Sequence, residues 1–415
     1  MGTFFSILHL KDLRSRIFFT LGILFLYRFG SHIPISGIDV ASLQKLFNAG
    51  GVLGFFNLFS GGGLSRFSIF GLGILPYINA SIIIQLATII WPKLKDIAEE
   101  GESGRRQLSQ YTRYLAIGIA VIQAIVMSTG FKNFVMPDVS FSFFFFYSVI
   151  GLVAGSALVM WFGELITEFG VGNGASLLIF VGIIAQMPFY FKNTYVLLMG
   201  GGSVVGVLVL LCVFVMMIVA IVIIQEAQRR IPVQYAKRII GRKMYSGQST
   251  YIPLKLVQGG VMPIIFSSAV LQFPLMFSQF FKIKGVQNFF HYDGFFYNFV
   301  FCILIFFFTY FYTAVTFNPQ ELSDNIKKNG GFVMGVRPGK ATVEFFDKIV
   351  SKLTLVGAAF LAMIALVPIV SANLTTVTSF MGLGGTALLI IVGVAIDLIK
   401  QIEAMIVTKK YEGLV

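Results

Sequence analysis

The sequence predicts an all-α polytopic membrane protein with ten transmembrane helices. Of its 415 residues, 57% are hydrophobic and only 12% are charged, and its mean hydropathy is +0.86. Such a chain cannot cover its apolar surface with polar side chains in water, so lipid must be its solvent. The 46 Phe and 43 Gly residues suit a bilayer, where helices use Gly at close contacts.

Apolar stretches of about 20 residues are long enough to cross a bilayer as helices. Pro76, Pro263, Pro274 and Pro368 fall inside or at the ends of such stretches, and broken helices are typical of spans that line a cavity. Ten stretches of spanning length cover residues 17–35, 68–91, 114–130, 143–163, 174–190, 203–224, 257–277, 297–317, 353–371 and 384–400.

The segments before the first span and after the last span are both short. Residues 1–16 predict a retained amphipathic helix on the membrane surface, because their apolar stretch is too short for a cleaved signal peptide. Residues 401–415 form a tail. Cys212 and Cys302 lie inside apolar stretches, so we expect them to be packing residues rather than a disulfide.

Positive charge is concentrated on one side of the predicted bundle. When alternate loops are assigned to the same compartment, roughly 24 of the 31 Lys and Arg residues share the side of the N-terminus, and Arg28 lies within a span. The positive-inside rule then places both termini in the cytoplasm, which requires an even number of spans. We expect a multi-pass protein of the cell inner (plasma) membrane.

Two loops on the positive side are longer than a topology signal needs. The loop 225–256 carries many Lys and Arg residues against Glu226 alone, and the loop 318–352 has a Gly-rich turn around Arg337. Basic loops often do no more than orient spans. The length of these two favours a further role, because a protruding basic surface suits an acidic protein or ribosomal RNA.

The spans lack the groups that other membrane functions need. Asp397 is the one acidic residue near the middle of a span, and it lies toward one end. A secondary transporter for a small solute is the alternative function, but an ion-coupled transporter normally buries ionisable groups. An intramembrane hydrolase would need catalytic groups. We expect no enzymatic activity, no cofactor and no metal site.

The segment between the first two spans, FFNLFSGGGLSRFSIFGLGILP, is apolar but too rich in glycine to cross a bilayer as one helix. It is either a re-entrant segment or a loop outside the membrane. A re-entrant segment is permitted only where protein or water surrounds it.

Seven strings, in family order, resemble the SecY family, the channel subunits of the bacterial protein translocon. Together they extend over more than three hundred residues. They are SGGGLSRFSIFGLGILPYINASIIIQL, GNGASLLIF, QRRIPVQYAKR, YIPLK with GGVMPIIFSS, NPQELSDNIKKNGGF, GVRPGKAT and GGTALLIIV.

The resemblance implies two pseudo-symmetric five-helix halves around an hourglass pore. Residues 17–190 would form the N-terminal half, with a plug at 59–71, and residues 191–400 the C-terminal half. The implied function is to pass unfolded secretory polypeptides across the membrane and to release transmembrane segments into lipid through a lateral gate.

The resemblance also implies the residues of the pore. The family's ring of bulky aliphatic side chains falls on Ile74, Ile78, Ala175, Ile179, Ile265 and Ile390. Ala175 departs from the usual branched residue. The plug would begin with Phe59, Ser60, Gly61, Gly62, Gly63, Leu64, Ser65 and Arg66. A narrow apolar ring excludes ions by dewetting, and its flexible side chains can part around a peptide.

A lateral gate would lie between the second and seventh spans and would carry Gln85, Val257, Gln258 and Ser267. Many members have Asn where this chain has Val257. The residues implied to dock cytoplasmic partners are Arg229, Arg230, Arg242, Lys243 and Arg337; Met334 stands nearby where the family usually has Pro. The implied partners are the SecE and SecG subunits, the SecA motor ATPase, the ribosome with its RNA and proteins, unfolded preprotein and signal peptide substrates, and membrane lipid.

Overall fold

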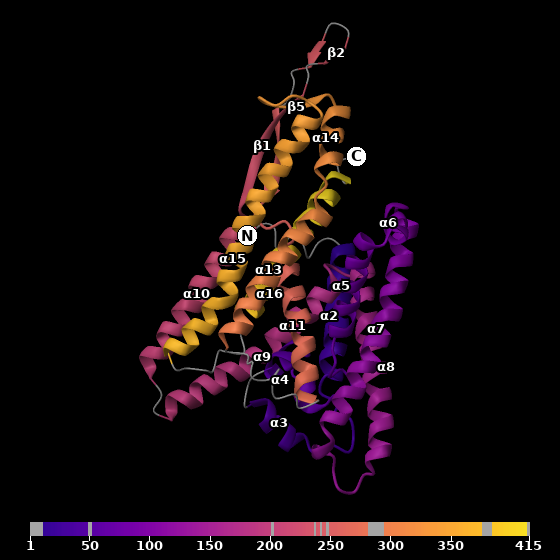
Figure 1. Cartoon of the computed structure of the whole chain (residues 1–415), viewed down its shortest axis with the longest axis vertical. Coiled ribbons are helices and arrows are strands. Elements are labelled where there is room, and N and C mark those ends of the chain that lie inside the picture. Colours follow the sequence, from indigo (N-terminus) through magenta and orange to yellow (C-terminus); the bar gives the residue numbers. More distant parts are fainter. Residues whose placement is uncertain are drawn as a thin grey trace.

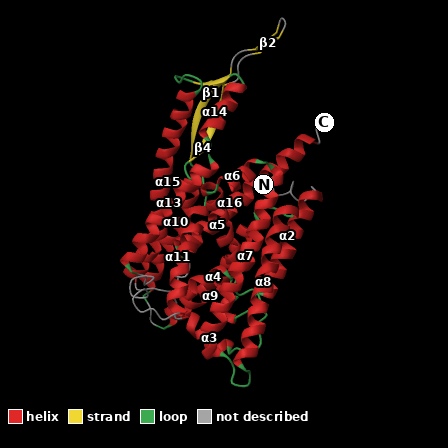
Figure 2. Ribbon diagram, turned by 45° about the vertical axis from the view of Figure 1, so that its right-hand side comes forward, coloured by secondary structure: helices red, strands yellow, loops and turns green. Residues whose placement is uncertain are grey.

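The structure is a computed structural model of the whole chain. It describes residues 11–48, 52–200, 203–235, 238–240, 243–245, 249–280, 294–375 and 384–412. Long helices run side by side in one bundle, and a small sheet stands at one end of it (Figures 1 and 2).

Each of the ten predicted spans falls on a helix, which confirms the predicted all-α architecture. The helices are α2 (Lys11–Gly30), α5 (Leu75–Ile90), α7 (Glu102–Gly130), α8 (Phe141–Phe169), α9 (Gly174–Met199), α10 (Val204–Glu226), α11 (Met262–Phe280), α13 (Phe295–Thr316), α15 (Lys340–Thr375) and α16 (Gly385–Glu412). Residues 11–16, which were expected to lie on the membrane surface, belong to α2 itself, and residues 1–10 lie outside the described ranges.

Length and apolar composition alone qualify six helices as membrane spans within the described residues. The number is seven if α5 counts together with α6 (Pro92–Glu99), which is bent from it by 102°. The bend occurs at Trp91, whose extended backbone ends α5 and precedes a proline at the first position of α6. Proline there costs no hydrogen bond, because the first amides of a helix have no intrahelical acceptor.

The helices pack in two groups that follow chain order. Helices α2, α5, α7, α8 and α9 pack on one another, as do α10, α11, α13, α15 and α16. In Figure 1, α2, α5, α7 and α8 lie on the right and α10, α13, α15 and α16 on the left, while α9 of the first group passes below the second group. The two groups meet where α9 packs against α16 and where α5 packs against α11.

The two long basic loops fold together into one unit at the end of the bundle. Strand β1 (Gln228–Tyr235) pairs antiparallel with both β4 (Ser249–Lys255) and β5 (Gly331–Val333), so the strand order is β4-β1-β5. The short strands β2 (Arg238–Ile240) and β3 (Lys243–Tyr245) pair at its tip (Figure 1).

This basic unit, as we call it, includes α14 (Pro319–Lys328) and the first turns of α15. It has a hydrophobic core separate from that of the membrane bundle. The core residues are Ile231, Val233, Leu254, Ile326, Val333, Phe346 and Val350. The sequence predicts two separate loops here, whereas the structure joins them around shared side chains.

The chain between α2 and α5 packs inside the helix bundle. It contains α3 (Val40–Asn48), α4 (Val52–Phe59) and the 3-10 turn η1 (Leu64–Arg66). Asp39 caps α3 by accepting hydrogen bonds from Ser42 Oγ at 2.5 Å and from the Ala41 amide at 3.0 Å. These bonds favour the ionised carboxylate and lower the pKa of Asp39, with the Ser42 hydroxyl as the largest cause.

Backbone pairing holds the segment after η1 in place. The Ile35 amide donates to Phe67 O at 2.9 Å, and the Ile69 amide donates to Ile33 O at 3.1 Å. Helix α4 packs against α9 and α11. The glycine-broken segment therefore returns into the bundle, which is the re-entrant alternative that the sequence left open.

The core of the basic unit can be tested with two Phe→Ala variants. Phe346 is fully buried and Phe332 is 40% exposed. We expect Phe346→Ala to lower the free energy of unfolding of the unit by about 3–5 kcal/mol, because it leaves a cavity. Phe332→Ala should change it by less than about 1 kcal/mol. Urea-dependent proteolysis within residues 225–256 measures both, and equal rates would contradict a separate core.

Candidate functional site

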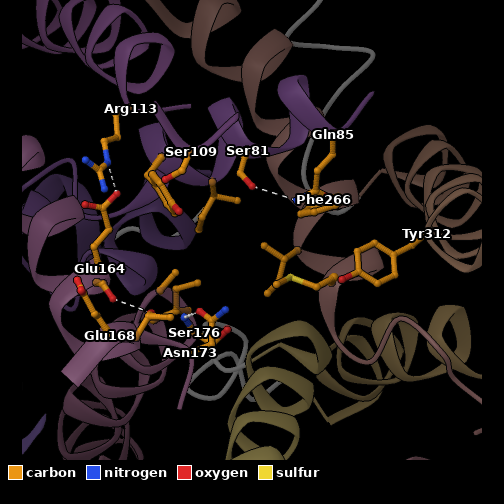
Figure 3. A pocket seen from close by; sticks show the side chains of 18 residues that line it. Ser81, Gln85, Ser109, Arg113, Glu164, Glu168, Asn173, Ser176, Phe266 and Tyr312 are labelled. Carbon is orange, nitrogen blue, oxygen red and sulfur yellow. Dashed lines mark hydrogen bonds and ion pairs between the residues drawn. The ribbon is translucent and has the colours of Figure 1, made fainter. Parts of the chain in front are cut away.

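A cavity of about 460 Å³ lies between the two groups of helices (Figure 3). The first group lines it from α5, α7, α8 and α9, and the second from α11 and α13. The lining residues are Tyr77, Ile78, Ser81, Gln85, Ser109, Arg113, Gly163, Glu164, Thr167, Glu168, Asn173, Ala175, Ser176, Ile179, Met262, Ile265, Phe266 and Tyr312.

Part of the cavity lining is aliphatic, and we call this part the floor of the cavity. Four of the six predicted ring residues line it: Ile78, Ala175, Ile179 and Ile265. The other two, Ile74 and Ile390, are buried in the same hydrophobic core and do not line the cavity. All six residues come from α9, α16, α11 and α5 or its N-cap, which are the helices through which the two groups meet.

One wall of the cavity is polar. Arg113 Nε donates to Glu164 Oε1 at 2.6 Å, and Glu164 is the more buried partner. Asn173 caps α9 by accepting a hydrogen bond from the Ser176 amide. Figure 3 shows these groups on one side of the space, with Phe266 on the other. The cavity therefore combines ionised and amide groups on its wall with a floor of aliphatic side chains.

A close helix contact sets the position of the polar wall. A Cβ atom at Gly174 would lie 1.9 Å from Gly163 O, so only glycine permits this approach of α9 to α8. Thr167 bridges the same helices: its hydroxyl donates to Gly163 O at 2.8 Å and accepts from the Gly174 amide at 2.9 Å. The first turn of α9, which carries Ala175 and Ser176, is thereby fixed against α8.

The predicted gate helices α5 and α11 pack against each other. Gln85 lines the cavity and donates to Ser81 Oγ at 3.1 Å on its own helix. Ser267 is fully buried and donates to Pro263 O at 2.7 Å, within α11. The structure thus brings the two helices together, but the Ser267 hydroxyl and the Gln85 amide each form their hydrogen bond within their own helix.

The other two predicted gate residues precede α11. Val257 is buried, and a Cβ atom at Gly357 of α15 would lie 3.3 Å from its Cγ2. Gln258 is half-buried. Neither lines the cavity. The position where the family often has Asn therefore packs toward α15 in this chain.

The predicted plug segment lies farther along α9 than the cavity. Asn173, Ser176 and Ile179, at the start of α9, line the cavity. A Cβ atom at Gly182 would instead lie 3.2 Å from Phe59 O and 3.3 Å from the Gly61 amide. Since a helix rises about 1.5 Å per residue, Ile179 lies between the cavity and the segment.

Hydrogen bonds to Asn57 of α4 and within the segment itself satisfy its irregular backbone. Asn57 accepts two of them, from the Gly62 amide on its backbone oxygen and from the Ser65 amide on Oδ1, both at 2.8 Å. The Leu64 amide donates to Ser60 Oγ at 3.0 Å. Gly61 has a φ of +63° and Gly62 of +85°, conformations that favour glycine.

Sequence reasoning missed the neighbours that hold this segment. Arg28 donates to Gly61 O through Nη1, and Gln186 lies over Gly62. Arg28 was interpreted only as a charge within a span. Its place inside an apolar helix, where charges are costly, was the signal that could have found it.

The predicted docking residues that can be placed lie on the basic unit. Arg229 and Arg230 are exposed on β1, and the Arg230 guanidinium carbon lies 4.8 Å from the ring centroid of Tyr251. Arg337 is exposed in the turn between β5 and α15, and Lys243 is on β3. Arg242 lies outside the described residues.

Cysteine labelling can test whether the cavity holds water. In a chain with Cys212→Ser and Cys302→Ser, we expect Ser176→Cys to react with a water-soluble maleimide at least about tenfold faster than Ile390→Cys. Ser176 lines the cavity and Ile390 is fully buried, and a thiol must reach water to ionise and react. Similar rates at both positions would contradict this assignment.

Comparisons with known proteins identify the family. A family model described as SecY matches residues 68–399. The protein translocase subunit SecY of Thermus thermophilus is 42% identical over 426 residues, covering 100% of this chain and 97% of the relative. That of Synechocystis sp. is 44% identical over 431 residues, covering 100% and 96%.

Solved structures share the fold at lower identity. One described as "The structure of a protein conducting channel" matches with a TM-score of 0.67 at 18% identity, covering 94% of this chain and 92% of that one. Another, "Sec61 in the Canine ribosome-channel complex from the endoplasmic reticulum", has a TM-score of 0.65 at 17% identity and the same coverage. The chain is a multi-pass membrane protein that belongs to the SecY family of protein translocase subunits.

Proposed function

We propose that this chain is the central pore-forming subunit of a protein-conducting channel. It passes unfolded secretory polypeptides across the bacterial plasma membrane and releases transmembrane segments into lipid. The observation that carries the proposal is the order of features along α9: a cavity with a polar wall, then Ile179 with its aliphatic neighbours, then the segment 59–71. The curated relatives are named protein translocase subunits.

The cavity and its floor fit the two demands on such a pore. An unfolded polypeptide exposes backbone groups that cost several kcal/mol each in lipid, so it needs an aqueous path. Arg113, Glu164 and Asn173 make the cavity wall wettable. The aliphatic ring below it blocks ions by dewetting and opens without offering hydrogen bonds to any particular sequence. No step in this function requires the chain to make or break a covalent bond.

The ring differs from an even aliphatic collar at one position. Ala175 lies on the cavity floor beside Ile179, and it is half-buried rather than fully buried. Ile78 and Ile265 occupy the same floor from α5 and α11. We infer that these larger neighbours close the space that the missing branched side chain would fill.

The segment 59–71 acts as a plug on the far side of the ring. Phe59, Ser60 and Leu64 are buried in the closed arrangement. When a polypeptide enters, the segment leaves by breaking its hydrogen bonds to Asn57, Ile33 and Ile35, whereas those within its own turns can persist.

The lateral gate lies between α5 and α11. Their contact is the part of the boundary between the two helix groups that borders the cavity. When the groups separate there, a segment in the cavity meets lipid and partitions into it if its apolar side chains outweigh its polar ones. Gln85 and Gln258 would supply polar groups near this opening, and Val257 would not.

The basic unit is the docking surface for the machinery that feeds the pore. It lies on the cytoplasmic side with both termini, as the charge asymmetry indicates. A ribosome, through its RNA and proteins, or the SecA motor ATPase would bind Arg229, Arg230 and Arg337. Two of the similar structures are described as ribosome complexes of Sec61 and of yeast Ssh1. SecE and SecG would be further subunits, in contact with the membrane bundle.

Depletion of the protein in its own cell tests the function. We expect precursors with signal peptides to accumulate uncleaved in the cytoplasm, because they lose the aqueous path that we propose this chain provides. Pulse-labelling followed by immunoprecipitation of a secreted protein measures this. Normal export combined with impaired uptake of one solute would instead favour a transporter.

A charge reversal on the basic unit tests docking. We expect Arg337→Glu to weaken ribosome or SecA binding about tenfold, because it replaces an attractive charge with a repulsive one. Binding of either partner to proteoliposomes measures the effect. Lys132→Glu is the matched control, since Lys132 is exposed and lies outside the basic unit. Equal binding by both variants would remove Arg337 from the docking surface.

A further inference from the structure

The tightest turn of the segment 59–71 is held between two helices. Gly61 O accepts a hydrogen bond from Arg28 Nη1 of α2. On the side of α9, a Cβ atom at Gly61 would lie 3.0 Å from Gly182 Cα, so the two backbones are nearly in contact. A Cβ atom at Gly62 would lie 2.2 Å from Gln186 Nε2. The turn therefore packs between α2 and α9, and Arg28 is the charged side chain that contacts it.

The surroundings of Arg28 prepare it for this bond. Arg28 is in the last turn of α2, where the helix dipole favours a cation. The fully buried Ser31 donates to Arg28 O at 2.7 Å, and Arg28 Nη1 lies 3.4 Å from Ser31 Oγ. His32 Nδ1 is 2.9 Å from the same carbonyl oxygen. These bonds fix the end of α2 from which the guanidinium reaches the turn.

Topology does not explain an arginine at this position. Arg28 lies at the end of α2 away from the N-terminus, so the positive-inside rule would favour a neutral residue there. A charge within a membrane helix is costly and is normally retained for a function. Within the described residues, the hydrogen bond that joins Arg28 to a distant part of the chain is the one to Gly61, in the predicted plug.

We propose that Arg28 is the latch of the channel, a positioning residue whose hydrogen bond to the Gly61 carbonyl holds the segment 59–71 in the closed position. This inference rests on the proposed role of that segment as a plug. A charge-assisted hydrogen bond in a site of low polarity is stronger than a neutral one. Because it ends on a backbone carbonyl, the latch needs no particular side chain at the turn.

A second arginine opposes the latch. Arg66 lies in η1, five residues after Gly61, and its positive charge repels that of Arg28. Its Nη1 atom is buried and has no hydrogen-bond partner within the described part of the chain. The closed position thus combines a favourable hydrogen bond from Arg28 to Gly61 with an unfavourable electrostatic interaction between Arg28 and Arg66.

The test is the resting ion conductance of the complete reconstituted channel complex in a planar bilayer, without substrate. We expect Arg28→Gln to raise it about tenfold or more, since a hydrogen bond from a charged group contributes that much to an equilibrium. Arg28→Lys should leak less than Arg28→Gln. Arg66→Gln should lower the conductance below that of the unaltered channel.

A matched control separates the latch from general effects of charge. Arg16 lies on the same helix and is exposed, so Arg16→Gln should leave the conductance unchanged. Assembly of each complex is checked by its elution from a sizing column. An assembled Arg28→Gln channel that conducts no more than the unaltered channel, or no more than Arg16→Gln, would overturn the latch.

Deletion of residues 60–66 distinguishes this inference from the plug itself. The deletion should raise the conductance, and Arg28→Gln should then add nothing further. An equal added effect of Arg28→Gln in the deleted chain would show that it acts elsewhere and would overturn the latch alone. A deletion that leaves the conductance unchanged would overturn the plug assignment, and the latch with it.

Discussion

The fold depends on the requirement that backbone amides and carbonyls find partners where no water is available. The long helices meet it within themselves. The chain between Phe59 and Leu75 cannot, because it is not a continuous helix, and it meets the requirement with side chains and turns. Asn57 and Ser60 accept hydrogen bonds from four of its amides, two on side-chain oxygens and two on backbone oxygens, and Arg28 donates to one of its carbonyls. Irregular backbone in the interior is therefore possible here only because polar side chains are brought to it.

The same requirement distinguishes helix pairs that are joined by hydrogen bonds from pairs that only pack against each other. Within the first group, α8 and α9 approach so closely that only glycine fits at Gly174, and Thr167 bonds both helices. Between the groups, α5 meets α11 through side chains whose hydrogen bonds are internal to each helix, as at Gln85 and Ser267. Parting these two helices breaks none of those bonds, whereas parting α8 from α9 would.

Much of the fold could be predicted from the sequence because spanning helices are signalled locally. Each apolar stretch predicts one helix, and each of the ten predicted spans overlaps a helix of the structure. The basic unit could not be predicted this way, since its sheet pairs Val233 with Val333, and its core joins Ile231 to Phe346. The ring was inferred by resemblance, and Ile74 and Ile390 prove to be packed beside the cavity rather than on its floor. The partner of Arg28 was invisible because its hydrogen bond ends on a backbone atom, which leaves no mark on the sequence.

The pairing of β1 with β5 has a consequence for the order in which the protein is made. Strands β1 and β4 leave the ribosome well before α14 and β5, and α13 must enter the membrane in between. Until then the sheet lacks one edge, and the core lacks Ile326, Val333 and Phe346. The surface that we propose for docking is therefore completed only after α13, α14 and β5 have been made.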